Sequence, residues 1–405
     1  MEENRVKAGS GSGSGSPGVS PVELSDCLEH LLHFVLQSSI NGTLDFNLGL
    51  SADFCSTLLK QDDFDHQNLP TSTNFSEGVP PYPLYKHLAS ALHQWIISGS
   101  ISSSSENVPL LCEDETLKEM KIKWNELVSQ KGSELVNMFK KINFELHVQE
   151  PYFWLLKDGK KTIEGRCAVG NYNRIQSGDL ILFNKCLMVE VQDVHHYHSF
   201  MEMLEAEQLE DVLPGVQTVD EGEQIYRKFY TEEKEQLNGV LAIYVGRLAS
   251  QPYIVLSDTI SGLGYRGIQK LLGLKQTVGT IAEALPPPRS ALLSSFAQPH
   301  KSNIKGCTLT EGARALTKHV SRCSSNYWGK VGGNDFNKNH LAMEVIIRII
   351  GHCRWLNVHF VQPHGPVFEI RISEGYGARW SEDGTKFIGF LEPYMEDGHL
   401  KQWRH

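Results

Sequence analysis

The segment GKKTIEGR, residues 159–166, combines side-chain types that proteins use to recognise nucleotides. Lys160, Lys161 and Arg166 are cationic, and Glu164 is the carboxylate among them. A guanidinium can grip a phosphate or a base edge through two hydrogen bonds, a lysine supplies a mobile point charge, and a carboxylate accepts from an exocyclic amine. The combination predicts contact with a nucleotide.

Alternation along the pattern KTIEGRC predicts which of these side chains point the same way. In a strand, Thr162, Glu164 and Arg166 share one face, while Ile163 and Cys167 lie on the other face and fill the core. The two lysines then stand at the mouth of the strand, so the nucleic-acid-binding set runs from the lysines to the guanidinium. The alternative is an ordinary ion pair between the carboxylate and the guanidinium.

Catalysis is a separate question, because cleavage of an RNA strand requires groups that transfer protons and hold a phosphate. A lysine and a tyrosine can do this, and Lys161 and Tyr172 are the candidates in this region. The segment favours binding over catalysis, and it leaves ribonuclease activity open.

The elements that must position these residues are short strands interrupted by helices, between residues 143 and 250. Pro151 and Gly159 mark the first position and the left-handed end of a helix, EPYFWLLKDG. Strands are expected at NFELHV, KTIEGRC, LILFN, CLMVEVQDVHHYHSF and GVLAIYVGRL. Because strand–helix–strand alternation is not regular, the pattern predicts a small mixed barrel instead of a doubly wound sheet.

Three motifs in this region, FWLLKDGKKTIEGR, IQSGDLILF and FYTEEKEQLNGVLAIYVGRL, resemble the ASCH (activating signal cointegrator homology) family in order and spacing. The barrel of that family is similar to the PUA RNA-binding fold. The resemblance covers residues 143–250, about a quarter of the chain. It implies a module that binds RNA or a modified nucleoside, with GKKTIEGR lining the cleft.

Members of the family include transcription coactivators, and some bacterial members are small amidohydrolases or ribonucleases. In the amidohydrolase branch, a threonine nucleophile follows a lysine by three residues. Lys161 matches that lysine, but Glu164 stands where the threonine would be, and Thr162 is displaced from it. The resemblance therefore does not extend to amidase activity.

The front of the chain is acidic and helical. Residues 1–20 are a Gly/Ser-rich flexible segment, and residues 21–142 show helical periodicity between polar loops. Residues 1–139 hold 18 acidic and 8 basic residues. The region predicts a helical domain that stabilises the protein or docks transcription or RNA-processing proteins.

The tail of the chain, residues 301–405, predicts a basic α+β domain: two helices, then strands of an antiparallel sheet. Residues 286–405 hold 10 acidic and 15 basic residues. Asp383-Gly384 indicates a hairpin turn in YGARWSEDGTKFIGF. This tail resembles a module that accompanies ASCH domains in plant-type proteins.

A second basic and aromatic patch is expected in this tail, at Arg371, Arg379, Trp380 and Lys386. Aromatic rings stack bases and cations hold phosphates, as single-stranded nucleic acids require. The alternative is that the tryptophan belongs to the core of the sheet.

Two other motifs do not predict a cofactor or a metal. Gly262, Gly264 and Gly267 match a dinucleotide fingerprint, but the second strand is missing, so they indicate turns in a connector at residues 251–300. His196 and His198 share a strand face without a third ligand of suitable spacing.

The composition and the first residues of the chain indicate the class of protein. The net charge is −10, the start lacks a secretory signal, and no span is long and apolar enough for a membrane helix. The eight cysteines form no C-x-x-C pair and are expected to be buried, reduced thiols. We therefore expect a soluble nuclear or cytoplasmic protein that binds RNA or a nucleotide. A protein-docking coactivator and a ribonuclease or nucleoside-directed hydrolase are the alternatives.

Overall fold

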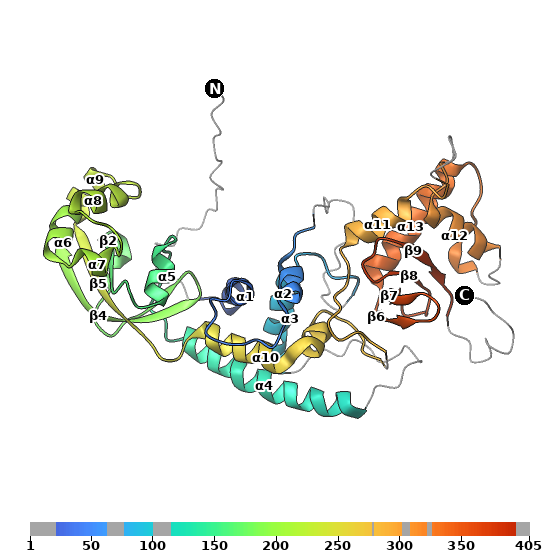
Figure 1. Ribbon diagram of the computed structural model, residues 1–405, viewed down its shortest axis with the longest axis horizontal. Coiled ribbons are helices and arrows are strands. Elements are labelled where there is room, and N and C mark those ends of the chain that lie inside the picture. The colour runs from blue at the N-terminus through green and yellow to red at the C-terminus, as the bar shows by residue number, and fades with distance from the viewer. Residues whose placement is uncertain are drawn as a thin grey trace, which may run out of the picture. The chain divides into compact units, whose positions relative to one another are not determined.

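The computed structural model describes residues 22–62, 77–99, 115–277, 279–301, 308–321 and 326–393 (Figure 1). The chain divides into two compact units. Unit 1 comprises Met1–His30 and Leu135–Tyr253, and unit 2 comprises Leu31–Glu134 and Ile254–His405. The predicted α+β multidomain class is confirmed. The predicted flexible segment, residues 1–20, lies outside the described residues.

Unit 1 contains a five-stranded sheet that curls into a half-barrel. Its strands, in spatial order, are β1 (Phe144–Leu146), β3 (Leu180–Phe183), β4 (Leu187–Tyr197), β5 (Val240–Arg247) and β2 (Ile163–Cys167). β1 pairs with β3 in parallel, and the other pairs are antiparallel. A bulge between Val191 and Asp193 bends β4 where it crosses β5. The five predicted strands are confirmed.

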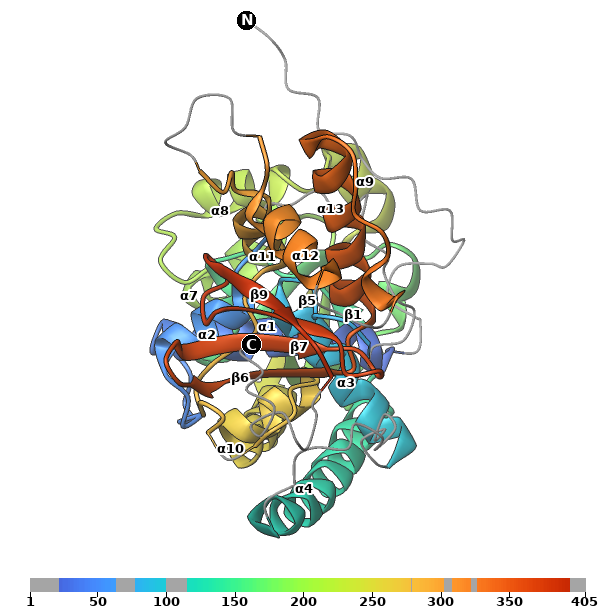
Figure 2. The same ribbon diagram turned by 90° about the vertical axis from the view of Figure 1, so that its right-hand side faces the viewer.

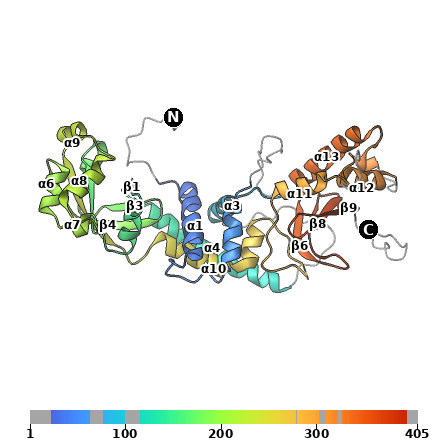
Figure 3. The same ribbon diagram turned by 45° about the horizontal axis from the view of Figure 1, so that its top comes forward.

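Helices lie against this sheet after β4. α6 (Phe200–Ala206) contacts β4 and β5, α7 (Leu209–Val212) and α9 (Glu232–Asn238) contact β2, and α8 (Val219–Arg227) contacts α6. Unit 1 also contains α5 (Tyr152–Lys157) and a 3-10 helix, η2, at Gly170–Arg174. Figure 3 shows α6 to α9 gathered beside β4. The side chains of Ser199, Thr218 and Thr231 cap α6, α8 and α9. As predicted, Ile163 and Cys167 are buried, and they pack in the core beneath these helices.

The first part of unit 2 is helical. It contains α2 (Ala52–Leu59), α3 (Leu84–Ser98) and most of α1 (Leu24–Ile40), α4 (Glu115–Phe139) and α10 (Pro252–Leu271), whose remaining residues belong to unit 1. Within the connector expected at residues 251–300, Pro252–Leu271 form a helix, which is interrupted where Gly264 has φ 58° and ψ −168°. The turn interpretation of Gly262 and Gly267 is wrong. Both are helical, and small residues are needed there because a Cβ would approach Leu127 or Leu263.

A four-stranded antiparallel sheet ends unit 2. Its strands lie in chain order: β6 (Trp355–Val361), β7 (Gly365–Arg371), β8 (Gly377–Ser381) and β9 (Phe387–Leu391). One face is covered by α11 (Arg289–Ala297), α12 (Glu311–Val320) and α13 (Asp335–His352), and η3 spans Asn326–Trp328 (Figure 2). Gly384 takes φ 74° in the β8–β9 turn, which confirms the predicted hairpin.

Two further findings concern the whole described chain. None of its helices has the length and apolarity that crossing a membrane requires. Five cysteines, Cys27, Cys55, Cys167, Cys186 and Cys353, are free thiols and buried.

Candidate nucleic-acid interface

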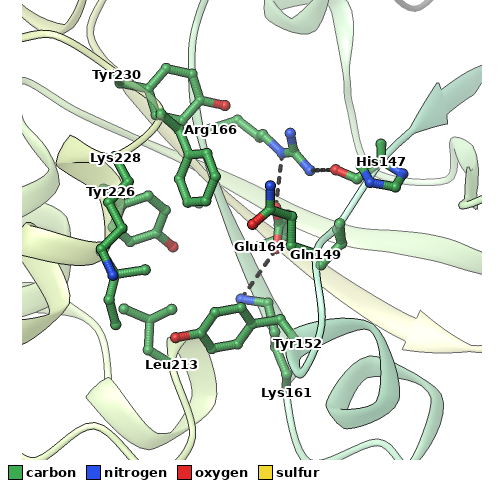
Figure 4. A pocket seen from close by; sticks show the side chains of 14 residues that line it. His147, Gln149, Tyr152, Lys161, Glu164, Arg166, Leu213, Tyr226, Lys228 and Tyr230 are labelled. Carbon is green, nitrogen blue, oxygen red and sulfur yellow. Dashed lines mark hydrogen bonds and ion pairs between the residues drawn. The ribbon is translucent and has the colours of Figure 1, made fainter. Parts of the chain in front are cut away.

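A cavity of about 510 Å³ opens in unit 1 between strand β2 and the chain that follows β1. The α7–α8 region supplies its opposite wall. Figure 4 shows Tyr226, Tyr230 and Lys228 on that wall, across from Glu164 and Arg166. The lining residues are His147, Val148, Gln149, Tyr152, Lys161, Glu164, Gly165, Arg166, Leu213, Ile225, Tyr226, Lys228, Phe229 and Tyr230.

A carboxylate between two cations lies at the base of the cavity. Glu164 Oε2 lies 3.2 Å from Lys161 Nζ, and Glu164 Oε1 lies 2.8 Å from Arg166 Nε. The ion pair considered from the sequence is thus present, and it lines a cavity. The side chain of Glu164 is only 9% exposed, so its carboxylate faces the cavity and the protein more than bulk water.

Lys161 is a fixed support for this carboxylate. Its ammonium donates to the carbonyl of Ile163 at 2.7 Å and to the carbonyl of Val212, besides its contact with Glu164. These three acceptors use all three ammonium protons. Burial lowers the pKa of Lys161, and the nearby Glu164 raises it in part. The lysine is therefore not the mobile charge expected from the sequence.

Arg166 joins β2 to the segment after β1. Its Nη2 donates to the carbonyl oxygen of His147 at 2.5 Å. Burial opposes the charge, but Glu164 and then Tyr230 raise the pKa of the guanidinium above its ordinary value. The group is a permanent cation at the side of the cavity, and it is partly exposed.

Aromatic rings form the wall opposite the carboxylate. The ring of Tyr226 stacks on Phe200 with centroids 4.2 Å apart, and Phe200 stacks on Tyr230 at 5.2 Å. Tyr226 fits because position 165 is glycine: a Cβ there would lie 2.4 Å from the tyrosine oxygen. Burial raises the pKa values of Tyr226 and Tyr230, so both hydroxyls stay neutral and can donate hydrogen bonds.

Not all residues nominated from the sequence reach the cavity. Lys161, Glu164 and Arg166 line it, whereas Lys160 and Thr162 do not. Lys160 is exposed, and Thr162 is held by its backbone, which donates to Asp211 and accepts from Val245. Tyr172, the other catalytic candidate, lies in η2 and outside the cavity lining.

The aromatic wall of the cavity, and the chain at His147 on the other side, were not predicted from the sequence. Tyr226, Lys228, Phe229 and Tyr230 follow one another in IYRKFY, a basic and aromatic cluster at the end of α8. That composition is a usable signal for nucleic-acid contact. The contribution of His147 gives no such signal, because it depends on the curl of the sheet.

The second predicted patch divides between the two faces of the C-terminal sheet. Arg371 and Arg379 meet on one face at the buried carboxylate of Glu369. Trp380 lies on the other face, fully buried, and its ring nitrogen donates to the carbonyl of Leu292. Its ring therefore packs as core and is not presented for stacking. Lys386 is exposed in the β8–β9 turn.

His198, one of the two histidines considered as a metal pair, has a carboxylate beside it. His198 lies 3.0 Å from Glu202, its neighbour on α6. Within the described ranges, no group of three or more His, Cys, Asp and Glu side chains is arranged to hold a metal ion.

Two family models match separate parts of the chain. Residues 146–248 match the ASCH domain, and residues 298–392 match the CdiA C-terminal tRNase toxin domain. The first range contains β2 and the whole wall of the cavity from α7 to Tyr230. The second contains the C-terminal sheet with its helices α12 and α13.

Two solved structures are similar to about a quarter of the chain. The crystal structure of the hypothetical protein PH0355 is 46% identical, covering 26% of this chain and 97% of that one, with a TM-score of 0.25. The solution NMR structure of protein PF0455 from Pyrococcus furiosus is 47% identical, covering 26% and 97%, with a TM-score of 0.24. No curated protein matches the chain. The chain belongs to the proteins that carry an ASCH domain, and residues 146–248 form that domain.

Proposed function

We propose that the ASCH domain binds single-stranded RNA and takes one unstacked base, or a modified nucleoside, into the cavity beside Glu164. The observation that carries the proposal is the carboxylate of Glu164, held between two cations and facing a wall of tyrosines. Such a carboxylate accepts from amino or imino groups of a base edge. The match to the ASCH domain is consistent with RNA binding.

The residues around the carboxylate can contact the base inside the cavity and the phosphate at its rim. Tyr226 and Tyr230 offer ring faces or hydroxyls to the base. At the rim, Lys228 and Phe229 are exposed, and they can contact a phosphate and a flanking base. Lys161 takes no direct part, because its protons are already bound by the protein.

Fluorescence polarisation with labelled single-stranded RNA, over a salt series, tests this proposal. Lys228→Ala and Phe229→Ala change exposed lining residues, and each should weaken binding about 10-fold. Lys160→Ala and Leu237→Ala are matched controls: both residues are exposed in unit 1 and lie outside the lining. Lys228→Ala should also reduce the slope of log affinity against log salt concentration by about one. Equal losses in controls and lining variants, or no binding at low salt, would contradict the proposal.

Cleavage of RNA is a second candidate function, located in unit 2. The observation that favours it is the match of residues 298–392 to a tRNase toxin domain. The test is to incubate the full chain with labelled tRNA in EDTA and to separate the products on a denaturing gel. Intact tRNA at high protein concentration would rule out metal-independent cleavage.

A further inference from the structure

We propose that the polar face of the C-terminal sheet is the RNA-cleaving site, with His359 as the proton acceptor and Arg371 and Arg379 as the phosphate-binding groups. The proposal rests on the second candidate function, cleavage of RNA. It names the residues, which the family match does not supply.

The register of the sheet brings these residues together. Asn357 on β6 lies opposite Glu369 on β7, and Glu369 lies opposite Arg379 on β8. His359 and Arg371 are each two positions along from this row, so they share its face. The opposite face carries Phe368, Ile370, Ala378 and Trp380, all fully buried. The sheet therefore has one apolar face and one face that concentrates charge.

Glu369 is the centre of the charged face. Its Oε1 lies 2.6 Å from Arg371 Nε, and its Oε2 accepts from Arg379 Nε at 2.9 Å and Nη2 at 2.6 Å. Burial alone would raise the pKa of Glu369, but His359 and the two guanidinium groups lower it to about 2. The carboxylate is therefore ionised at neutral pH and fixes both guanidinium planes. Arg371 Nη1 also donates to the carbonyls of Gly375 and Glu392, which leaves its Nη2 protons for a phosphate.

The same carboxylate orients His359. The imidazole Nε2 lies 3.3 Å from Glu369 Oε2, and the ring packs edge-on against Trp355 with centroids 5.8 Å apart. A carboxylate at Nε2 favours the tautomer with its proton there, which leaves Nδ1 as an acceptor. The side chain of His359 is 19% exposed, so a substrate can reach it. A proton acceptor and two phosphate-binding cations thus share one carboxylate.

The charged face has open space beside it. The residue opposite Arg379 on β9 is Gly389, and apart from its two neighbours in the chain no described residue has an atom within 4 Å of the position that a Cβ would take there. The side chains of Arg371 and Arg379 are 17% and 14% exposed. A ribose-phosphate can therefore approach the row from the β9 side.

The arrangement is suited to cleavage by the neighbouring ribose hydroxyl. The 2′ oxygen attacks the adjacent phosphorus while its proton passes to Nδ1 of His359, and the bond from phosphorus to the 5′ oxygen breaks. Water protonates the departing 5′ oxygen, and the resulting hydroxide takes the proton from His359. Arg371 and Arg379 stabilise the extra charge on the phosphorane. The products carry a 2′,3′-cyclic phosphate and a 5′-hydroxyl, and no metal or redox partner is consumed.

Cleavage of labelled tRNA by the full chain in EDTA tests the assignment. His359→Asn should lower the rate about 100-fold or more, because proton transfer by a positioned side chain contributes about that much. His364→Asn is the matched control, since His364 is exposed in the β6–β7 turn. Arg379→Lys keeps the charge beside Glu369 but loses the fork of two donors, and it should also lower the rate.

The outcomes separate the assignment from the function on which it rests. The site is supported if the wild type cleaves tRNA and His359→Asn and Arg379→Lys do not. The two variants must keep the wild-type unfolding temperature, and His364→Asn must cleave at the wild-type rate. If the wild type and both variants cleave equally, the site assignment is overturned and the cleavage function stands. If the wild type does not cleave, the cleavage function fails and the assignment falls with it. If His359→Asn does not fold, the cleavage rate of Arg379→Lys tests the site assignment in its place.

Discussion

The ammonium of Lys161 and the carboxylate of Glu164 form a buried pair, with Nζ and Oε2 3.2 Å apart. The pair supports the cavity from within, because both side chains are less than 10% exposed and the lysine has no proton left for a ligand. The two residues therefore have different roles in the site. Lys161 positions the carboxylate, and Glu164 presents it.

Removing the lysine should destabilise the protein. Lys161→Met leaves Glu164 buried with Arg166 as its remaining cation, and breaking a buried pair costs about 3–5 kcal/mol. Urea denaturation measures this loss. Adding Glu164→Gln should recover part of it, because the uncompensated charge is removed. Lys160→Met, at an exposed position, should change stability by no more than about 0.5 kcal/mol. An equal effect of the two lysine changes would contradict the pairing.

A methyl group at position 165 should displace Tyr226. The Cβ of Gly165→Ala would lie 2.4 Å from the tyrosine oxygen and 2.8 Å from Met203 Cε. Overpacking of this kind costs about 1–3 kcal/mol. Tyr226→Phe in the same chain removes the closest atom and should relieve part of the cost. The double-mutant cycle measures this coupling, and strictly additive effects would contradict it. Gly389→Ala, a strand glycine with open space at its Cβ, is the control.

Acid should destabilise unit 2 through Glu369. The folded-state pKa is about 2, below the ordinary value of 4.5, so this contribution is complete above pH 4.5 and is lost as pH falls towards 2. The shift corresponds to about 3 kcal/mol. In urea denaturation, the stability difference between wild type and Glu369→Gln should shrink over that pH range. A difference that stays constant with pH would show that the carboxylate is not the group responsible.

The buried thiols should resist alkylation in the native protein. Burial raises the pKa values of Cys27 and Cys353 to about 12, and that of Cys167 to about 11. Because the thiolate is the reactive form, iodoacetamide at pH 8 should label these residues only after unfolding in guanidinium. Peptide mapping by mass spectrometry gives the site of each label. Rapid native labelling at Cys27 or Cys353 would contradict the packing.

Much of the fold was predictable because the strands carry local signals. Alternation placed Ile163 and Cys167 in the core, and Asp383-Gly384 marked the hairpin. The turns expected at Gly262 and Gly267 were wrong, because glycine spacing does not distinguish a turn from a helix in which small residues allow close packing. Such packing depends on neighbours far away in the sequence.

The sites were less predictable than the strands. The facing of Glu164 and Arg166 follows from alternation, but the burial of Lys161 depends on the carbonyl of Val212, 51 residues away. Glu369 was missed because its importance comes from its register with Arg379 on the next strand. Alternation gives the face of a strand, and it does not give the partner strand or its alignment.

The strand order of the ASCH sheet gives its cavity a mechanical property. β1 and β2, separated in sequence by α5, are the two free edges of the sheet, and Arg166 connects β2 to the chain after β1 through His147. A ligand in the cavity contacts both the chain after β1 and strand β2, so it connects the two edges of the half-barrel. Occupancy should then slow amide hydrogen exchange in residues 144–149 and 163–167 together, as one opening motion. The two edges would share a single rate although only one of them carries the carboxylate.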